Sequence, residues 1–292
     1  MTTFITAGTS QVGLALARLL HASNHSVLLG SRRQGQGIPA PNSWVSFDWS
    51  DASTFPNPFN DTKSKIQSVL LILSTELDPI PQVGPFVDLA AEKGVKRFVL
   101  VGAADVSKGG SNIGKVHQYL EEKGVEFVVL RPTWFLDNLA RTQLANIRDK
   151  DAILTPTPTA RVAFVSVDDI AEAAFDALTR PSPIPAPGED KESAAAPIIL
   201  GPELLSYDEV ANTLTEVLGR KITHRHITTN EVLEQYDGFG IPRGSETAKF
   251  LLNLELGLER GDAERLLNLP EERKRVGKVR LRDWAEKNKA VW

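Results

Sequence analysis

The chain lacks cysteine and long uninterrupted apolar segments. Without cysteine it has no disulfide, no thiol nucleophile and no cysteine-ligated metal. No apolar run approaches the ~20 residues that a helix needs to cross a bilayer. The N-terminus also has no basic segment ahead of a long apolar core, because Phe4–Ala7 is typical of a first strand, so we expect a cytoplasmic protein without a membrane partner.

The chain also has no large excess of positive or negative charge. The 33 basic and 37 acidic residues are well mixed and give a formal net charge of −4, which leaves no electrostatic footprint for nucleic acid. Histidine is scarce, and only His224 and His226 share the spacing of one strand face. That spacing suits either a metal pair or a polar strand face; the polar face is favoured, and no metal is expected.

Strand and helix patterns alternate through the first half of the chain. Continuous apolar runs such as residues 69–73 and 98–101 are typical of parallel strands buried on both faces. We therefore predict an α/β fold, a Rossmann-type doubly wound parallel sheet whose cofactor lies across the carboxyl ends of its strands. The expected strands are Thr3–Ala7, Ser26–Gly30, Val45–Phe47, Val69–Ser74, Arg97–Gly102 and Glu126–Arg131, and the expected crossover helices are Val12–His21, Pro81–Lys93 and Asn112–Lys123.

The alternation fades after Arg131, which indicates a second region. We expect a cofactor domain over residues 1–150, with 160–200 returning to its sheet, and a smaller, mostly helical substrate lobe over 201–292. Ser206 and Glu209 form the capping box of a helix that ends at Leu218, before Gly219. The other elements expected here are a helix Asp169–Thr179 capped by Asp168, a strand Ile198–Leu200, helices Asn230–Tyr236, Ser245–Leu258, Asp262–Leu269 and Leu281–Lys289, and loops Thr155–Thr159 and Pro181–Pro197.

The turn after the first strand predicts a dinucleotide site. A small-residue turn that leads into a helix lets a pyrophosphate approach the helix N-terminus. The glycine pattern is incomplete, because Ser10 occupies its middle position, and a ridge of small residues between any strand and helix is the alternative interpretation. The residues expected to hold the pyrophosphate are Gly8, Thr9, Ser10, Gln11, Val12 and Gly13.

The end of the second strand predicts which dinucleotide binds. An NAD-specific protein places a carboxylate there for the ribose hydroxyls, whereas this chain has Ser31, Arg32 and Arg33. Guanidinium groups suit a 2′-phosphate, so we predict NADP(H), with a solvated basic loop as the alternative. Further cofactor contacts are expected at the ends of the later strands, from Asp48 on the adenine side and from Ser74, Thr75, Gly102, Ala103 and Pro132.

A Tyr/Lys pair four residues apart serves as the general acid of many short-chain dehydrogenases. Among the three tyrosines only Tyr119 has a lysine, Lys123, at that distance. Both lie at the end of a predicted helix, remote from the carboxyl ends of the strands, so we interpret Tyr119 as a packing residue and Lys123 as a solvated charge.

A family resemblance is carried by the segments 95–101, 116–120, 128–138, 166–171 and 200–207. These segments resemble the NmrA-like branch of the atypical short-chain dehydrogenases, over residues 1 to about 220. Within this branch, residues 47–49, 57–59, 114–117, 131–135 and 288–292 are similar to the fungal festuclavine and agroclavine dehydrogenases of ergot alkaloid biosynthesis.

The resemblance implies an NADPH-dependent reductase that acts on an iminium, and it also shows a departure. The lysine common in this branch falls on Ile113, and the serine after the fifth strand is replaced by Gly102 or Ala103. Reduction of a carbonyl needs a proton donor or an oxyanion stabiliser, whereas a cationic C=N bond needs chiefly orientation and a dry apolar face. The missing pair therefore favours an imine, an iminium or a conjugated double bond over a carbonyl. The resemblance implies that the substrate is a hydrophobic or indole-like amine or iminium.

The candidate substrate residues follow the sixth strand. Trp134 and Phe135 are expected either to wall the nicotinamide and substrate or to pack between lobe and sheet. Asp137 either holds a cationic amine or, as we favour, caps with Asn138 a helix near Leu139. Asn138 matches the motif of the family, and His117 is either a proton relay or a packed histidine.

Three functions remain open at this stage. The favoured one is the reductase. The alternatives are an NADP-sensing regulator without catalysis and an NADP-bound isomerase or cyclase without net redox chemistry. A homodimer is compatible with each of them.

Overall fold

The computed structural model describes residues 2–60, 65–73, 76–180 and 195–292 of the chain. They form two compact units, each built from separate stretches. The first unit comprises Met1–Arg131 and Ile170–Pro197, and the second comprises Pro132–Asp169 and Ile198–Trp292. The second unit thus begins at the end of the sixth strand. The division into a cofactor domain over 1–150, with 160–200, and a substrate lobe over 201–292 remains a prediction.

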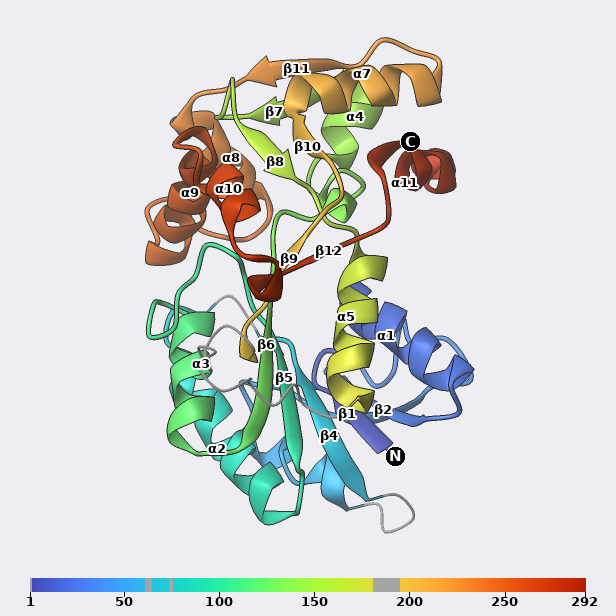
Figure 1. Ribbon diagram of the computed structural model, residues 1–292, viewed down its shortest axis with the longest axis vertical. Helices are drawn as coiled ribbons and strands as arrows, with labels where there is room; N and C mark the ends of the chain where they lie inside the picture. Colours follow the sequence, from blue (N-terminus) through green and yellow to red (C-terminus); the bar gives the residue numbers. More distant parts are fainter. Residues whose placement is uncertain (1, 61–64, 74–75, 181–194) are drawn as a thin grey trace. The chain divides into compact units, whose positions relative to one another are not determined.

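The first unit contains the predicted parallel sheet (Figure 1). Within the described residues its strand order is β6-β5-β4-β1-β2-β3, and every neighbouring pair is parallel. Phe4 lies in register with Leu28 on one side and Val69 on the other. The strands are β1 (Thr2–Ile5), β2 (Ser26–Ser31), β3 (Ser43–Ser46), β4 (Ile66–Leu71), β5 (Arg97–Val101) and β6 (Glu126–Pro132).

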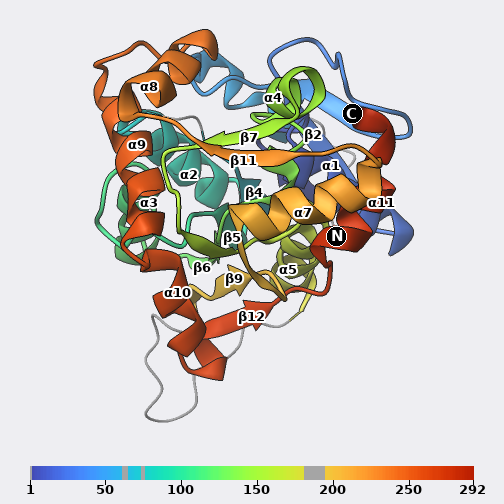
Figure 2. The same ribbon diagram turned by 90° about the horizontal axis from the view of Figure 1, so that it is seen from above.

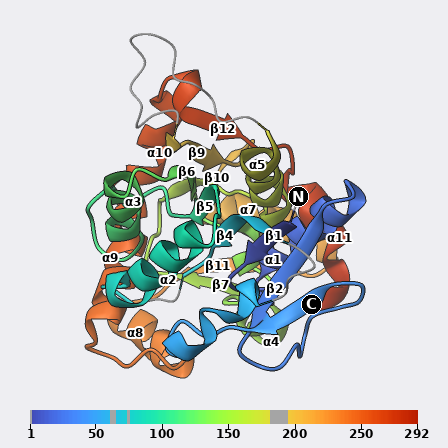
Figure 3. The ribbon, with the colours of Figure 1, turned by 90° about the horizontal axis from the view of Figure 1, so that it is seen from below.

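Helices cover both faces of this sheet, so the doubly wound prediction is confirmed. Figure 3 shows α2 (Ile80–Glu92) and α3 (Ile113–Glu122) on one face, and α1 (Gln11–Ala22) and α5 (Val167–Thr179) on the other. The core beneath α2 and α3 is rich in large side chains buried to within a few per cent, such as Phe4, Phe86 and Phe98. Full burial on both faces explains the uninterrupted apolar runs of the strands. Two short 3-10 helices, η1 (Ala52–Thr54) and η2 (Asn57–Phe59), follow β3.

The second unit pairs its short strands two by two. β7 (Ala152–Thr155) is parallel to β11 (Thr223–His226), β8 (Arg161–Ala163) is antiparallel to β10 (Leu204–Ser206), and β9 (Ile198–Leu200) is parallel to β12 (Lys274–Val276). Figure 2 shows β7 and β11 side by side along α7. The helical elements are η3 (Leu136–Asn138), α4 (Leu144–Lys150), α7 (Tyr207–Leu218), α8 (Thr229–Gly238), α9 (Glu246–Glu259), α10 (Asp262–Arg265), η4 (Leu266–Asn268), η5 (Glu271–Arg273), α11 (Leu281–Lys287) and η6 (Lys289–Val291).

Helix α7 begins and ends where its sequence predicts. The Ser206 hydroxyl accepts a hydrogen bond from the Glu209 N–H, and the Glu209 carboxylate accepts one from the Ser206 N–H. Gly219 ends the helix in the left-handed conformation, with φ of 71°. Such caps satisfy backbone groups that a helix leaves unpaired at its ends, which is why they can be identified from local sequence.

Two predicted helix starts are wrong. Helix α5 begins at Val167, and Ser166, rather than Asp168, accepts the capping hydrogen bond from the Asp169 N–H at 3.0 Å. No helix begins at Leu139, because the chain forms only the 3-10 turn η3 before α4 starts at Leu144. Residues 181–194 of the predicted loop Pro181–Pro197 lie outside the described residues. Among the described residues no helix has the length and apolar character of a membrane span.

Candidate functional site

The turn after β1 brings the backbone of β1 and β2 into close contact. The Gly8 N–H donates a hydrogen bond of 2.9 Å to the Gly30 carbonyl oxygen. A Cβ atom at Gly8 would lie 2.5 Å from the Leu29 Cβ, and one at Gly13 would lie 2.7 Å from the Ala7 carbonyl oxygen. Both glycines are therefore required by close packing within the turn, which agrees with the small-residue signal in the sequence.

Ser10, the residue that interrupts the glycine pattern, is the N-cap of α1. Its hydroxyl accepts from the Gly13 N–H at 3.0 Å and donates to the Ala7 carbonyl oxygen at 2.7 Å. The serine thus stabilises the turn and satisfies one helix N–H, while the positive end of the α1 dipole stays directed at the turn. Gln11 and Val12 form the first turn of this helix.

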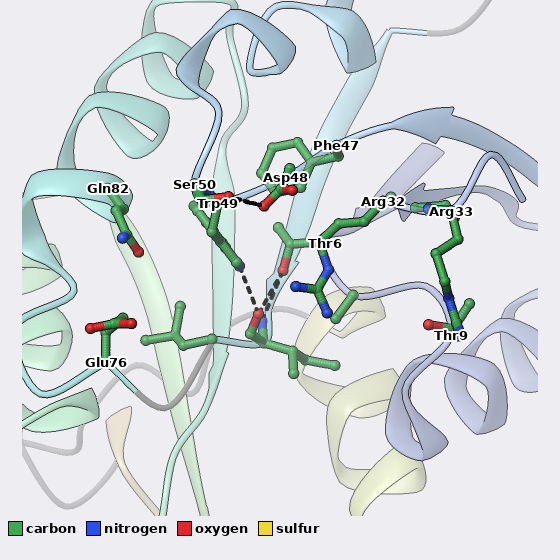
Figure 4. A pocket seen from close by; sticks show the side chains of 15 residues that line it. Thr6, Thr9, Arg32, Arg33, Phe47, Asp48, Trp49, Ser50, Glu76 and Gln82 are labelled. Atoms are coloured by element: carbon green, nitrogen blue, oxygen red, sulfur yellow. Dashed lines mark hydrogen bonds between the residues drawn. The ribbon is translucent and has the colours of Figure 1, made fainter. Parts of the chain in front are cut away.

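A cavity of about 520 Å³ opens in the first unit beside this turn, at the carboxyl ends of β1 to β4 (Figure 4). Five of the predicted cofactor residues line it: Thr9, Ser31, Arg32, Arg33 and Asp48. Its other lining residues are Thr6, Ala7, Gly30, Phe47, Trp49, Ser50, Ile72, Leu73, Glu76 and Gln82.

Both arginines reach this cavity from the end of β2, and their side chains are exposed there. Figure 4 shows Arg32 extending below Thr6 and Arg33 extending towards Thr9. The buried Ser31 hydroxyl accepts from the backbone N–H groups of Arg33 and Gly35, so it shapes the loop that carries the guanidinium groups. Two guanidinium groups on one cavity could hold a doubly charged phosphate, and this role of the arginines remains a prediction.

Asp48 faces the same cavity from the end of β3. Burial by itself would raise the pKa of Asp48, but hydrogen bonds from the Ser50 N–H and hydroxyl and the positive charge of Arg32 outweigh it, so the pKa is below its usual value. The group is therefore an ionised carboxylate at neutral pH, able to accept from an amino group.

The sequence reasoning missed an aromatic wall of this cavity. The Trp49 indole N–H donates to the Ile72 carbonyl oxygen at 3.0 Å, and its ring packs edge-on against Phe47 at 5.0 Å between centroids. Both residues flank Asp48 at the end of a strand, and that position was the available signal. In Figure 4, Gln82 and Glu76 lie on the far side of Trp49 from the two arginines.

Other predicted cofactor residues are not among the described residues that line this cavity. Gly102 and Ala103 follow β5, where the Arg131 guanidinium donates to the Ala103 and Ala104 carbonyl oxygens. Pro132 ends β6 and belongs to the second unit. Ser74 and Thr75 lie outside the described residues. The contact of these residues with a cofactor remains a prediction.

The two positions that depart from the NmrA-like pattern lie next to each other. A Cβ at Gly102 would lie 3.4 Å from the Ile113 Cγ2, and Ile113 packs against the apolar core of the first unit. The predicted packing role of Tyr119 agrees with its contacts, because its hydroxyl donates to Asp88 on α2 at 2.8 Å and Lys123 pairs with the same carboxylate. Burial and the negative charge of Asp88 raise the pKa of Tyr119, which opposes a role as a general acid at neutral pH.

Trp134, Phe135 and Asn138 meet in a small cavity of the second unit, of about 50 Å³. Seven further residues complete its lining: Leu139, Thr142, Gln143, Thr155, Phe164, Tyr207 and Glu255. Three of the four predicted substrate residues are thus brought together.

His117, the fourth, lines neither cavity. It is buried in α3 with 4% exposure, and its ring packs edge-on against Phe127, the second residue of β6, at 5.7 Å. This contact lies near the amino end of the strand, as expected for the packed alternative.

Asp137 neither caps a helix at Leu139 nor lines a described cavity. Its carboxylate accepts from the Val167 N–H at the start of α5 at 2.9 Å and from the Trp284 indole N–H at 3.2 Å. Burial raises the pKa of Asp137, and these two hydrogen bonds offset that rise only in part. The favoured capping role is correct in kind, but the capped helix is α5.

His224 and His226 lie on β11, as the spacing predicts. His224 Nε2 is 2.7 Å from the Thr155 hydroxyl and Nδ1 is 3.3 Å from Asp208, while His226 is exposed. Burial lowers the pKa of His224 and favours its neutral form. Within the described part of the chain no three metal-ligating side chains converge.

Comparison with known proteins adds the family. Residues 7–181 match the NAD(P)H-binding family. The chain is 36% identical to festuclavine synthase I of Penicillium roqueforti, over all of both chains, and 33% identical to agroclavine dehydrogenase of Claviceps fusiformis, over all of this chain and 99% of the other. The structure of Citrobacter sp. triphenylmethane reductase, solved with NADP(H), has a similar fold, with a TM-score of 0.69 at 19% identity over 99% of each chain.

Proposed function

Because this chain belongs to the NAD(P)H-binding family and to its oxidoreductases, we propose that it is an NADPH-dependent reductase of an iminium or imine in fungal alkaloid-type secondary metabolism. The observation that carries the proposal is that Gly102 and Ile113 lie next to each other. The sequence resemblance implies a serine at Gly102 or Ala103 and a lysine at Ile113, so this chain has apolar groups where a polar pair is implied. Hydride transfer to a carbonyl builds negative charge on oxygen and needs a donor there. A cationic C=N bond becomes a neutral amine on receiving the hydride, so an apolar surface is sufficient.

The first unit fits the dinucleotide. The turn around Gly8 and the N-terminus of α1 suit the pyrophosphate, because helix N–H groups and the helix dipole attract anions. Arg32 and Arg33 suit a 2′-phosphate, and the ionised Asp48 suits the adenine amino group. When bound, the reduced nicotinamide supplies the hydride.

The substrate class is proposed from two features. The curated relatives are named for festuclavine and agroclavine, and the second unit of this chain presents Trp134 and Phe135 to a cavity. Aromatic rings bind flat hydrophobic rings and cations through their faces. A hydrophobic or indole-like iminium combines both properties.

The test compares two substrates of similar shape, an N-methyl dihydroisoquinolinium ion and the ketone tetralone, by loss of NADPH absorbance. We expect the iminium to be reduced at least about a hundredfold faster, because a site without a general acid forgoes a contribution of that size for the ketone. Faster reduction of the ketone would contradict the proposal.

The same apolar pair also favours a second candidate, an NADP-sensing regulator without turnover. A regulator would bind the oxidised and reduced cofactors with different affinities and would oxidise no NADPH with any imine offered. Calorimetric titration of both cofactors, next to the turnover assay, separates the two candidates.

A further inference from the structure

The small cavity of the second unit combines aromatic rings with one carboxyl group. Phe164 packs edge-on against Tyr207, with 5.4 Å between centroids, and Trp134 and Phe135 complete the aromatic lining. Glu255 enters from α9. The volume of about 50 Å³ accommodates a small head group, such as a nitrogen with its attached methyl or methylene groups, rather than a whole ring system.

No cation compensates Glu255 in the part of the chain that the structure describes. Its Oε1 accepts one hydrogen bond, of 2.6 Å, from the Tyr236 hydroxyl on α8, and no described lysine or arginine pairs with it. Burial raises the pKa of Glu255, and the Tyr236 hydrogen bond only partly reverses this rise. A cation placed in the cavity would restore the ionised form, because an opposite charge nearby lowers a carboxyl pKa.

Tyr207, the first residue of α7, lines the same cavity. Burial and the negative charge of Glu255 both raise its pKa, so the hydroxyl stays protonated and near the carboxyl. A carboxylate that is buried without a counter-ion is costly, and a cation that pairs with it recovers this cost.

We propose that this cavity receives the cationic nitrogen of the substrate, with Glu255 as its counter-ion and the rings of Trp134 and Tyr207 against its charge. The proposal rests on the proposed function and names the group that recognises the iminium or the product ammonium. An anion would be repelled by the Glu255 carboxylate, and a neutral head group would leave this carboxylate without a counter-ion. The arrangement of one carboxylate and several aromatic faces is suited to an alkylated nitrogen cation.

The test measures binding by calorimetry on the full chain, with N-methylphenethylamine as the cationic probe and methyl phenethyl ether as its neutral isostere. The wild-type protein should bind the amine at least about tenfold more tightly than the ether. Glu255→Gln should remove this preference and leave the ether affinity unchanged. The control Glu246→Gln removes a charge from an exposed position on the same helix and should keep the preference.

Equal binding of amine and ether by the wild-type protein overturns the inference without any variant, as does a Glu255→Gln protein that keeps the preference. The turnover assay separates this inference from the proposed function. An iminium reduced with the same KM by Glu255→Gln and wild type overturns the role of Glu255 and leaves the reductase intact. Binding of the amine through Glu255 without NADPH oxidation supports the cavity and contradicts the reductase.

Discussion

The cavities of the two units differ in size and in the sign of their charged groups. The cavity of the first unit is about ten times larger, and it is bordered by a glycine turn, a helix N-terminus and two exposed arginines. The cavity of the second unit has one carboxyl group, Glu255, among aromatic rings. Positive groups in the first suit phosphate, and the negative group in the second suits a nitrogen cation.

The contrast teaches how each type of site can be recognised. The backbone turn and the arginines at a strand end suit a dinucleotide, a ligand that many proteins share. The sequence pattern of such a site is short and recurs from protein to protein, so it can be recognised from the sequence. The environment of the Glu255 carboxyl depends on helices α7, α8 and α9, which meet around it from separate parts of the chain and leave no local pattern in the sequence.

The largest expected effect comes from filling the glycine turn. Gly8→Val should destabilise the protein by about 3 kcal/mol and abolish NADPH binding, because the new side chain would overlap Leu29 and the Gly30 carbonyl group. Urea unfolding and NADPH fluorescence measure the two effects. As a control, Gly238→Ala, at the end of a helix in the second unit with no atom within 4 Å of the added Cβ, should change stability by about 0.5 kcal/mol or less. A stable Gly8→Val protein would show that the turn is less tightly packed than described.

The second prediction concerns the preference for NADPH, which carries a 2′-phosphate, over NADH, which lacks it. The double variant Arg32→Ala and Arg33→Ala should weaken NADPH binding about a hundredfold and NADH binding about threefold or less, because only NADPH carries the 2′-phosphate. Arg148→Ala, at an exposed arginine in the second unit, should leave both affinities unchanged. Equal losses for NADPH and NADH would assign the arginines to the pyrophosphate or to the loop itself.

The third prediction tests whether Tyr119 in the first unit acts as a general acid. Tyr119→Phe should retain the wild-type kcat and lose about 1 kcal/mol of stability or less, because only the hydrogen bond to the partly exposed Asp88 is removed. Steady-state kinetics and thermal unfolding measure the two quantities. A fall in kcat by orders of magnitude would place a proton donor on α3 after all.

The smallest expected effect is on the pH dependence of stability in the second unit. The raised pKa of Glu255 means that the folded chain binds this proton more tightly than the unfolded chain does. The unfolding free energy contributed by this group therefore falls as the pH rises from the ordinary glutamate value through the raised one, and it stays low above it. Glu255→Gln should remove this decline, as measured by urea unfolding at a series of pH values. An identical pH profile for both proteins would show that Glu255 ionises as it does in water.

The elements that could be predicted from the sequence are those with short-range causes. The strand, turn and helix of the first unit follow from apolar period and small residues, and the capping box of α7 follows from residues three positions apart. The helix predicted at Leu139 is absent, and the carboxylate of Asp137, its predicted cap, accepts hydrogen bonds from other groups. The donors are the N–H of Val167, 30 residues away, and the indole N–H of Trp284, 147 residues away. A local capping rule cannot include partners at that distance.

The sequence by itself determined the doubly wound sheet, the dinucleotide turn and the arginines at the end of β2, because each depends on neighbours along the chain. Only the tertiary structure decided that Gly102 and Ile113 touch and that Glu255 meets Tyr207 and Tyr236. In the sequence, Glu255 is one charged residue between two leucines on a helix, which is equally compatible with a solvent-exposed position. Its environment depends on the packing of three helices, and their contacts span up to 48 positions of the chain, beyond the reach of any periodic pattern.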